Sequence, residues 1–142
     1  MFKSLLFVCV YVENLKEAFD FYVNKLGFVE IGKSNDSVTV APSRNSETLI
    51  VLEPEDLKDW VNRSSGNSPL MALETKDCYE AVEELRARGV PIVTEPRETN
   101  DGIQAVIGDL YANHYLLIES RKSGSGEVLL SPRTFLQDVS RY

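Results

Sequence analysis

Hydrophobic residues along the chain follow two spacings, one typical of strands and one typical of helices. Residues 4–12 form an almost unbroken apolar run rich in valine and aromatic side chains, which predicts a buried strand. Over residues 15–26 the apolar positions recur three and four apart, which predicts a helix. Asn14 is a suitable N-terminal cap, Glu17 completes a capping pair, and Gly27 ends the helix.

The same order of elements occurs twice. Three further strands complete the first set, separated by turns rich in Asn, Asp and Ser. After a polar stretch at 54–68 the pattern restarts with a strand, a helix capped by Asp77 and three strands; an offset of 63 residues maps Asn14 onto Asp77. Each half is too short for a comfortable core of its own. We therefore predict a duplicated βαβββ domain, with modules 4–53 and 69–120 packed together.

The predicted domain occupies residues 1–120. Within it, 54–68 is expected to be a linker with a short helix that carries Trp60. Residues 121–142 are expected to form a flexible connector and a short helix that begins near Ser131. The apolar side chains of this tail helix indicate that it docks on the domain or on a partner subunit, or else closes the mouth of a binding site.

Charge and composition exclude several classes of protein. The 142 residues carry 22 acidic and 15 basic side chains, a net charge of −7. The tail has four bases and two acids, so the first 120 residues carry −9. This balance argues against binding to nucleic acid or to a membrane surface. No apolar run approaches the roughly 18–20 residues of a membrane span. Two cysteines without a paired spacing, and no signal-peptide cleavage site, predict a cytoplasmic protein.

Three stretches carry the motifs of a known family. Residues 8–28 contain a strand and a helix with the ending FY…LGF, residues 70–90 repeat this arrangement, and residues 108–120 form a closing turn and strand. Together they resemble the vicinal-oxygen-chelate superfamily, which includes glyoxalase I, extradiol dioxygenases and bleomycin-resistance proteins. The resemblance implies an α+β fold of two tandem βαβββ modules, whose curved mixed sheets surround a cleft. This is the glyoxalase/bleomycin-resistance fold.

The closing turn follows the family's DP-x-GN pattern only in part. Asp109 and Asn113 are kept, whereas Leu110 and Ala112 stand where the family has proline and glycine.

Metal-dependent members of this superfamily use two histidines and two glutamates on four strands. Carried over residue by residue, the histidine positions, each seven residues before a helix cap, fall on Phe7 and Leu70. One glutamate position falls on Leu116 and the other lies near Glu53. Phenylalanine and leucine have no donor atom for a divalent ion, and the chain has a single histidine. The resemblance thus implies a metal-free member without a cofactor, similar to the bleomycin-resistance branch.

The same positions mark the cleft-facing side of each strand, because strand side chains alternate between two faces. The resulting pocket is apolar and partly aromatic with a few carboxylates, which suits a flat or amphipathic organic molecule. The candidate ligand-binding residues are Phe7, Cys9, Tyr11, Val51, Glu53, Trp60, Leu70, Ala72, Glu74, His114, Leu116 and Ile118.

Several side chains allow two interpretations. His114 is either a general base or a solvated residue at a strand end. Trp60 either stacks on a ligand or pins the linker to the core. Cys9 is a nucleophile or, more simply, a small buried hydrophobe, and Glu53 contacts a ligand or lies in water. Cys78 lies in the first turn of a predicted helix, where the dipole favours a thiolate, although a structural role is the simpler interpretation.

The resemblance to the metal-free branch therefore implies a protein that binds a small organic ligand, cationic or aromatic, without turnover. The resemblance adds the expectation of a homodimer. Two alternatives stay open. The first is a glyoxalase-like or dioxygenase-family enzyme, either metal-free or with relocated ligands such as Glu53, Glu119 and His114. The second is a non-catalytic interaction subunit whose own side chains fill the pocket.

Overall fold

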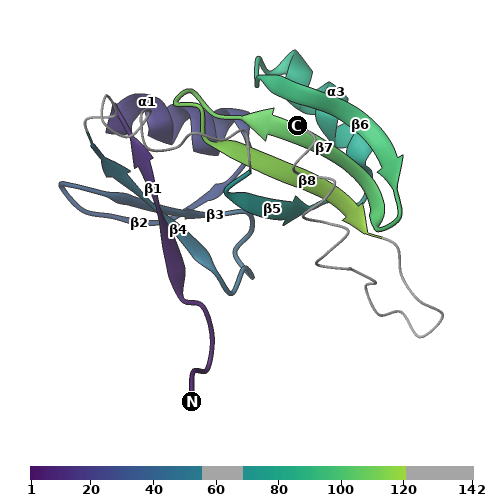
Figure 1. The fold of residues 1–142 in the computed structure, drawn as a ribbon. Helices are drawn as coiled ribbons and strands as arrows, with labels where there is room; N and C mark the ends of the chain where they lie inside the picture. The colour runs from purple at the N-terminus through teal and green to yellow at the C-terminus, as the bar shows by residue number, and fades with distance from the viewer. Residues whose placement is uncertain (56–68, 121–142) are drawn as a thin grey trace. The chain divides into compact units, whose positions relative to one another are not determined.

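The computed structural model describes residues 1–55 and 69–120. The chain divides into two compact units, residues 1–65 and 66–142, and each is described by itself. Each unit contains one four-stranded mixed sheet and one helical segment among its described residues (Figure 1). The predicted linker helix with Trp60 and the predicted tail helix lie outside the described residues. In the part of the chain that is described, no helix is long and apolar enough to cross a membrane.

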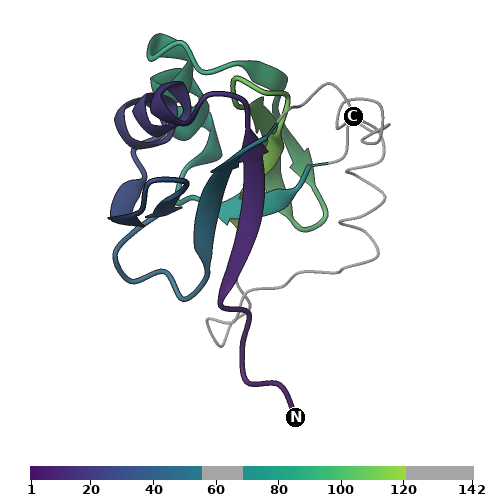
Figure 2. The ribbon, with the colours of Figure 1, turned by 90° about the vertical axis from the view of Figure 1, so that its left-hand side faces the viewer.

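The sheet of the first unit has the spatial order β1-β4-β3-β2, so that β1 forms one of its edges (Figure 2). Its strands are β1 (Phe7–Val12), β2 (Val29–Lys33), β3 (Val38–Ala41) and β4 (Leu49–Pro54). β1 and β4 run parallel, and the other two pairs are antiparallel. The predicted strand at 4–12 is shorter than expected, because residues 1–6 are exposed and only those from Phe7 onward are assigned to the strand.

Helix α1 (Leu15–Phe19) begins at the predicted cap, where Asn14 Oδ1 accepts a hydrogen bond from Glu17 N at 3.0 Å. It then widens into a π-helical segment, η1 (Asp20–Lys25). In this segment Leu26 N donates to Phe21 O, five residues earlier, at 2.9 Å. The sequence pattern predicts one continuous α-helix here, and the structure shows that its second half is π-helical.

The helical segment ends at Gly27, whose φ of 79° is in the left-handed region that favours glycine. Tyr22 O accepts a hydrogen bond from Phe28 N at 2.9 Å across this turn. The Tyr22 ring makes edge-on contacts with the rings of Phe21 and Phe28, and all three residues are buried. The FY…LGF motif therefore forms an aromatic part of the core and the turn that closes it.

The second unit repeats this arrangement. Its strands are β5 (Met71–Glu74), β6 (Ile92–Thr99), β7 (Gly102–Gly108) and β8 (His114–Ser120). They follow the order β5-β8-β7-β6, with β5 and β8 parallel. Helix α3 (Cys78–Ala87) packs on this sheet (Figure 1). Asp77 Oδ1 accepts from Glu80 N at 2.9 Å, as Asn14 does from Glu17 in the first unit. The predicted α+β fold of two βαβββ modules is confirmed.

Candidate ligand-binding faces

In the first sheet, β1 presents different residues to its two faces. Val10 and Val12 are buried, and the register connects Val10 through Leu52 to Val38, which lies beside α1. The intervening residues Phe7, Cys9 and Tyr11 lie on the opposite face, because side chains alternate along a strand.

Register adds two residues of β4 to this second face. Cys9 lies opposite Val51, and Tyr11 lies opposite Glu53. We call these five residues, from Phe7 to Glu53, the open face. Phe7 is 52% exposed, Cys9 is exposed and the other three are partly exposed. A benzyl ring, a thiol, a phenol, an isopropyl group and one carboxylate therefore reach solvent together.

In the second sheet, the position of α3 identifies the two faces. Glu119 Oε1 accepts a hydrogen bond from Cys78 N at the first turn of α3, at 2.8 Å. Odd-numbered residues of β8 therefore face α3, and the even-numbered Leu116 and Ile118 point the other way. Both are buried, Leu116 completely and Ile118 to 3% exposure.

Register assigns further side chains to this face, which we call the α3-distal face. Val106 and Ala72 lie opposite Leu116, and Gln104 and Glu74 lie opposite Ile118. Ala72 and Glu74, on the edge strand β5, are exposed, whereas Gln104 and Val106 are completely buried. The sequence-predicted residues of β5 and β8 thus share a face, and its centre is closed to solvent.

Gln104 is the functional candidate that the sequence reasoning missed. Its side-chain Oε1 and Nε2 are buried and have no hydrogen-bond partner among residues 1–55 and 69–120, and neither has the buried Oγ1 of Thr94 on the neighbouring strand. An unsatisfied buried polar group costs about 1–3 kcal/mol, so such groups in native proteins are unusual. The sequence feature that could have indicated this residue is its amide, which stands alone in the otherwise apolar β7 segment GIQAVIG.

The turn before β8 is held by one buried carboxylate. Asp109 Oδ1 accepts from the N–H groups of Tyr111 and Asn113, at 2.8 and 2.9 Å, and its Oδ2 accepts from Asn113 Nδ2 at 2.7 Å. Ala112 has φ of 63°, a left-handed conformation, at the position where the family has glycine. The two residues kept from the family motif therefore maintain the turn despite the loss of its glycine.

This turn fixes His114 at the start of β8, where its carbonyl accepts from Leu70 N at 2.7 Å. His114 shares the even-numbered face of β8, while Glu119 lies on the α3 face and bonds to Cys78 N. A pair of ligands on opposite faces of one strand does not converge on one ion. The relocated metal set that includes Glu119 and His114 is therefore not formed.

The residues at the superfamily's metal positions do not fit a metal ion. Both helices begin at the predicted caps, so counting seven residues back from each cap still gives Phe7 and Leu70 as the histidine positions. Leu70 is 49% exposed. Leu116 is buried among apolar neighbours. Hydrocarbon side chains supply no nitrogen, oxygen or sulfur ligand. Among residues 1–55 and 69–120, no group of three or more His, Cys, Asp and Glu side chains is placed to hold an ion.

The two cysteines differ in environment, and both are free thiols. Cys9 is exposed on the open face, so it is not the small buried hydrophobe that was the simpler expectation. Cys78 is buried at the start of α3. Burial, followed by the negative charges of Glu119 and Asp77, raises the pKa of its thiol to about 11. These effects outweigh the helix dipole, and Cys78 is a protonated structural residue at neutral pH.

The fold and the sequence together define the class of protein. Residues 4–113 match the model of the Glyoxalase/Bleomycin resistance protein/Dioxygenase superfamily, and the chain belongs to this superfamily.

Individual relatives add detail. The chain is 29% identical over 129 residues to an uncharacterized protein of Shewanella frigidimarina, covering 84% of this chain and 95% of the relative. The structure is similar to that of TnmS3, an antibiotic binding protein from Streptomyces sp. CB03234, with 25% identity, a TM-score of 0.71 and coverage of 84% and 98% of the two chains. UcmS2 is similar at 26% identity and a TM-score of 0.71, over 84% of this chain and all of that one.

Proposed function

We propose that this protein binds a small organic molecule without a metal ion and without chemical turnover. The observation that carries the proposal is the hydrocarbon character of Phe7, Leu70 and Leu116 at the superfamily's metal positions. Lyase and dioxygenase reactions in this superfamily use that ion as their Lewis acid or redox centre, and these side chains cannot ligate it. What the positions offer instead is apolar surface, which is the usual lining of a small-molecule site.

The chemistry of the open face indicates the class of ligand. Phe7 and Tyr11 present aromatic rings, and Glu53 presents a carboxylate beside Tyr11. A flat aromatic cation would stack on the rings and place its charge near Glu53. The net charge of −9 over the first 120 residues favours the approach of such a ligand. The similarity to an antibiotic binding protein supports a drug-like or metabolite-like molecule.

Gln104 supplies the specificity that apolar contacts lack. Its carboxamide has an NH₂ donor group beside an acceptor oxygen, and neither is hydrogen-bonded within the described part of the chain. A ligand edge with a matching acceptor and donor, such as an amide or lactam, would satisfy both. We propose this amide as a separate recognition point for such a ligand, on the α3-distal face of the second unit beside Val106 and Ile118.

We further propose that the protein is a cytoplasmic homodimer that takes neither nucleic acid nor a membrane surface as a partner. The acidic charge argues against nucleic acid and a membrane surface, the two free thiols fit a reducing compartment, and the dimer is what the family resemblance implies. Sedimentation at micromolar concentration tests the dimer, and a monomer at that concentration would refute it.

A thermal-shift screen tests the proposed function. Ligands that bind only the folded state raise the melting temperature. We expect stabilisation by aromatic cations or aromatic amides in the presence of a chelator, and no stabilisation by Mn²⁺, Fe²⁺, Ni²⁺ or Zn²⁺. Stabilisation by one of these ions, together with lyase or dioxygenase activity, would refute the proposal and favour the enzyme alternative.

A further inference from the structure

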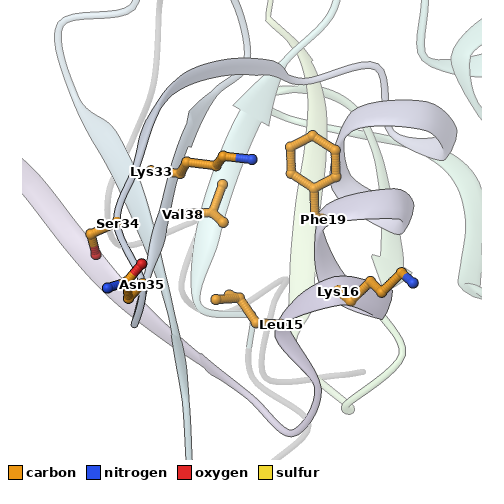
Figure 3. A pocket seen from close by; sticks show the side chains of 7 residues that line it. All are labelled: Leu15, Lys16, Phe19, Lys33, Ser34, Asn35 and Val38. Atoms are coloured by element: carbon orange, nitrogen blue, oxygen red, sulfur yellow. The ribbon is translucent and has the colours of Figure 1, made fainter.

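A cavity of about 480 Å³ lies between α1 and the hairpin formed by β2 and β3 (Figure 3). Leu15, Phe19 and Val38 form its apolar wall, and Lys33, Ser34 and Asn35 lie at the hairpin end. The side chain of Val38 shares the α1 side of the first sheet with Val10 and Leu52. The cavity is therefore on the opposite side of this sheet from the open face.

A β-bulge directs Lys33 to this side of the sheet. The register between β2 and β3 shifts between Glu30 and Gly32, so that Lys33, and not Gly32, lies opposite Val38. Bulges of this kind re-aim side chains and are frequent beside functional sites. Figure 3 shows the Lys33 side chain extending toward Phe19, with its ammonium group over the apolar wall.

The Lys33 ammonium has no carboxylate partner among the described residues, and the same is true of Lys16. Lys16 contributes to the lining, but Figure 3 shows its nitrogen directed away from the other labelled side chains. The inward-directed ammonium of Lys33 is therefore a positive charge without a carboxylate partner in the part of the chain that the structure describes.

Hydrogen bonds at the hairpin end order the backbone next to Lys33. Ser34 N donates to Ser37 O at 2.9 Å, the two serine hydroxyls are 3.1 Å apart, and Asp36 N donates to Ser34 Oγ at 3.3 Å. The backbone next to Lys33 is therefore fixed by a local network. The carboxamide of Asn35, on the rim, offers an additional hydrogen-bond donor.

We propose that this cavity is a second binding site, which takes an amphipathic organic monoanion such as an aromatic carboxylate or sulfonate. The apolar body packs on Leu15, Phe19 and Val38, and the acidic group pairs with the ammonium of Lys33. Its volume is in the range of small-molecule pockets, about 300–1,000 Å³. A single lysine matches a single negative charge. The site is independent of the proposed function, because it uses other residues on the other side of the sheet.

Titration of the ¹⁵N-labelled protein with 2-naphthoate tests the site. We expect amide shifts at Leu15, Lys33 and Val38 with naphthoate, and no shifts at these three residues with the cation 2-naphthylmethylammonium. Lys33→Met keeps the length of the side chain and removes its charge, and we expect it to weaken naphthoate binding about tenfold, as loss of a charge-assisted bond does. Lys76→Met, at an exposed lysine of the second unit, is the matched control and should not change the affinity.

Two results would overturn the proposal. One is equal affinity of the Lys33→Met variant and the unaltered protein for naphthoate. The other is a naphthoate titration that moves only the amides of Cys9 and Val51, which would assign the anion to the open face. Failure of the open face to bind a ligand would leave the shifts at Lys33 and Val38 unaffected, so the two proposals fail separately.

Discussion

Tyr11 lies directly opposite Glu53 in the parallel pairing of β1 with β4. Adjacent strands are about 4.8 Å apart, so a phenol and a carboxylate stand side by side on a face that also exposes Phe7. This combination provides both an aromatic surface and a negative charge for one ligand.

The first prediction concerns the charge of Glu53. Glu53→Gln keeps the shape of the side chain and removes its charge, and we expect it to weaken the binding of an aromatic cation by about five- to twentyfold, measured by calorimetry. Glu30→Gln, at an exposed position of β2, is the control and should have no effect. Equal affinity of the Glu53 variant and the unaltered protein for the cation would remove Glu53 from the site.

The second prediction concerns Gln104. Because both polar atoms of its amide are buried with no partner in the described residues, Gln104→Met should raise the free energy of unfolding of the ligand-free protein by about 1–2 kcal/mol in urea titrations. The same variant should bind an aromatic amide more weakly. Thr94→Val removes the buried hydroxyl that has no partner among the described residues, at nearly constant volume. It should raise the free energy of unfolding without changing the affinity for the amide. A destabilised Gln104→Met protein would mean that the amide has partners in solution.

The third prediction follows from the left-handed backbone of Ala112. Ala112→Gly should raise the free energy of unfolding by about 0.5–1 kcal/mol, because an L side chain is strained at this φ and glycine is not. Ala87→Gly, at the end of α3, is a control with the opposite expected effect, because glycine is less favourable than alanine in a helix. It should lower the free energy of unfolding by about 0.5–1 kcal/mol. Equal losses of stability in both variants would show that the turn is not strained.

The fourth prediction concerns the pH dependence of stability. Burial raises the pKa of Cys78 from the ordinary 9.0 to about 11. Below pH 9 the thiol is protonated in both states and contributes no pH dependence. Between pH 9 and 11 the unfolded thiol ionises while the folded one does not, so the free energy of unfolding falls as the pH rises. This fall should be smaller in Cys78→Ala, and identical slopes in the two proteins would contradict the assignment.

Thiol reactivity provides a separate check on the two cysteines. In the folded protein, iodoacetamide should modify the exposed Cys9 and spare Cys78, which is buried and protonated. Peptide mapping by mass spectrometry measures this. Modification of Cys78 at the rate seen in urea would show that α3 opens readily.

The strands and helix starts were predictable because they depend on local chemistry. Asn14 and Asp77 are residue types favoured as N-terminal caps, and short apolar runs bounded by polar turns indicated the strands. The π-helical turns at Phe21 were not predictable, because η1 has only six residues and the apolar spacing over so short a stretch does not separate an α-helix from a π-helix. The bulge that turns Lys33 toward α1 also escaped the sequence, since its register depends on pairing with β3.

The candidate site was predictable only in part. Parity along each strand assigned Phe7, Cys9 and Tyr11 to one face, but it gave no information on what covers a face. Exposure depends on tertiary packing, which is why Leu116 is buried while Phe7 is exposed. Trp60 lies outside the described residues, and its role as a ligand contact stays a prediction.

Metal stoichiometry tests the central claim most directly. The purified protein is incubated with Mn²⁺, Fe²⁺, Ni²⁺ and Zn²⁺ in turn and passed through gel filtration. The metal that stays bound is measured by inductively coupled plasma mass spectrometry. Because Phe7, Leu70 and Leu116 offer no ligand atoms, we predict that the protein retains far less than one ion per chain. Retention of one ion per chain, lost again in Glu53→Gln, would contradict the account.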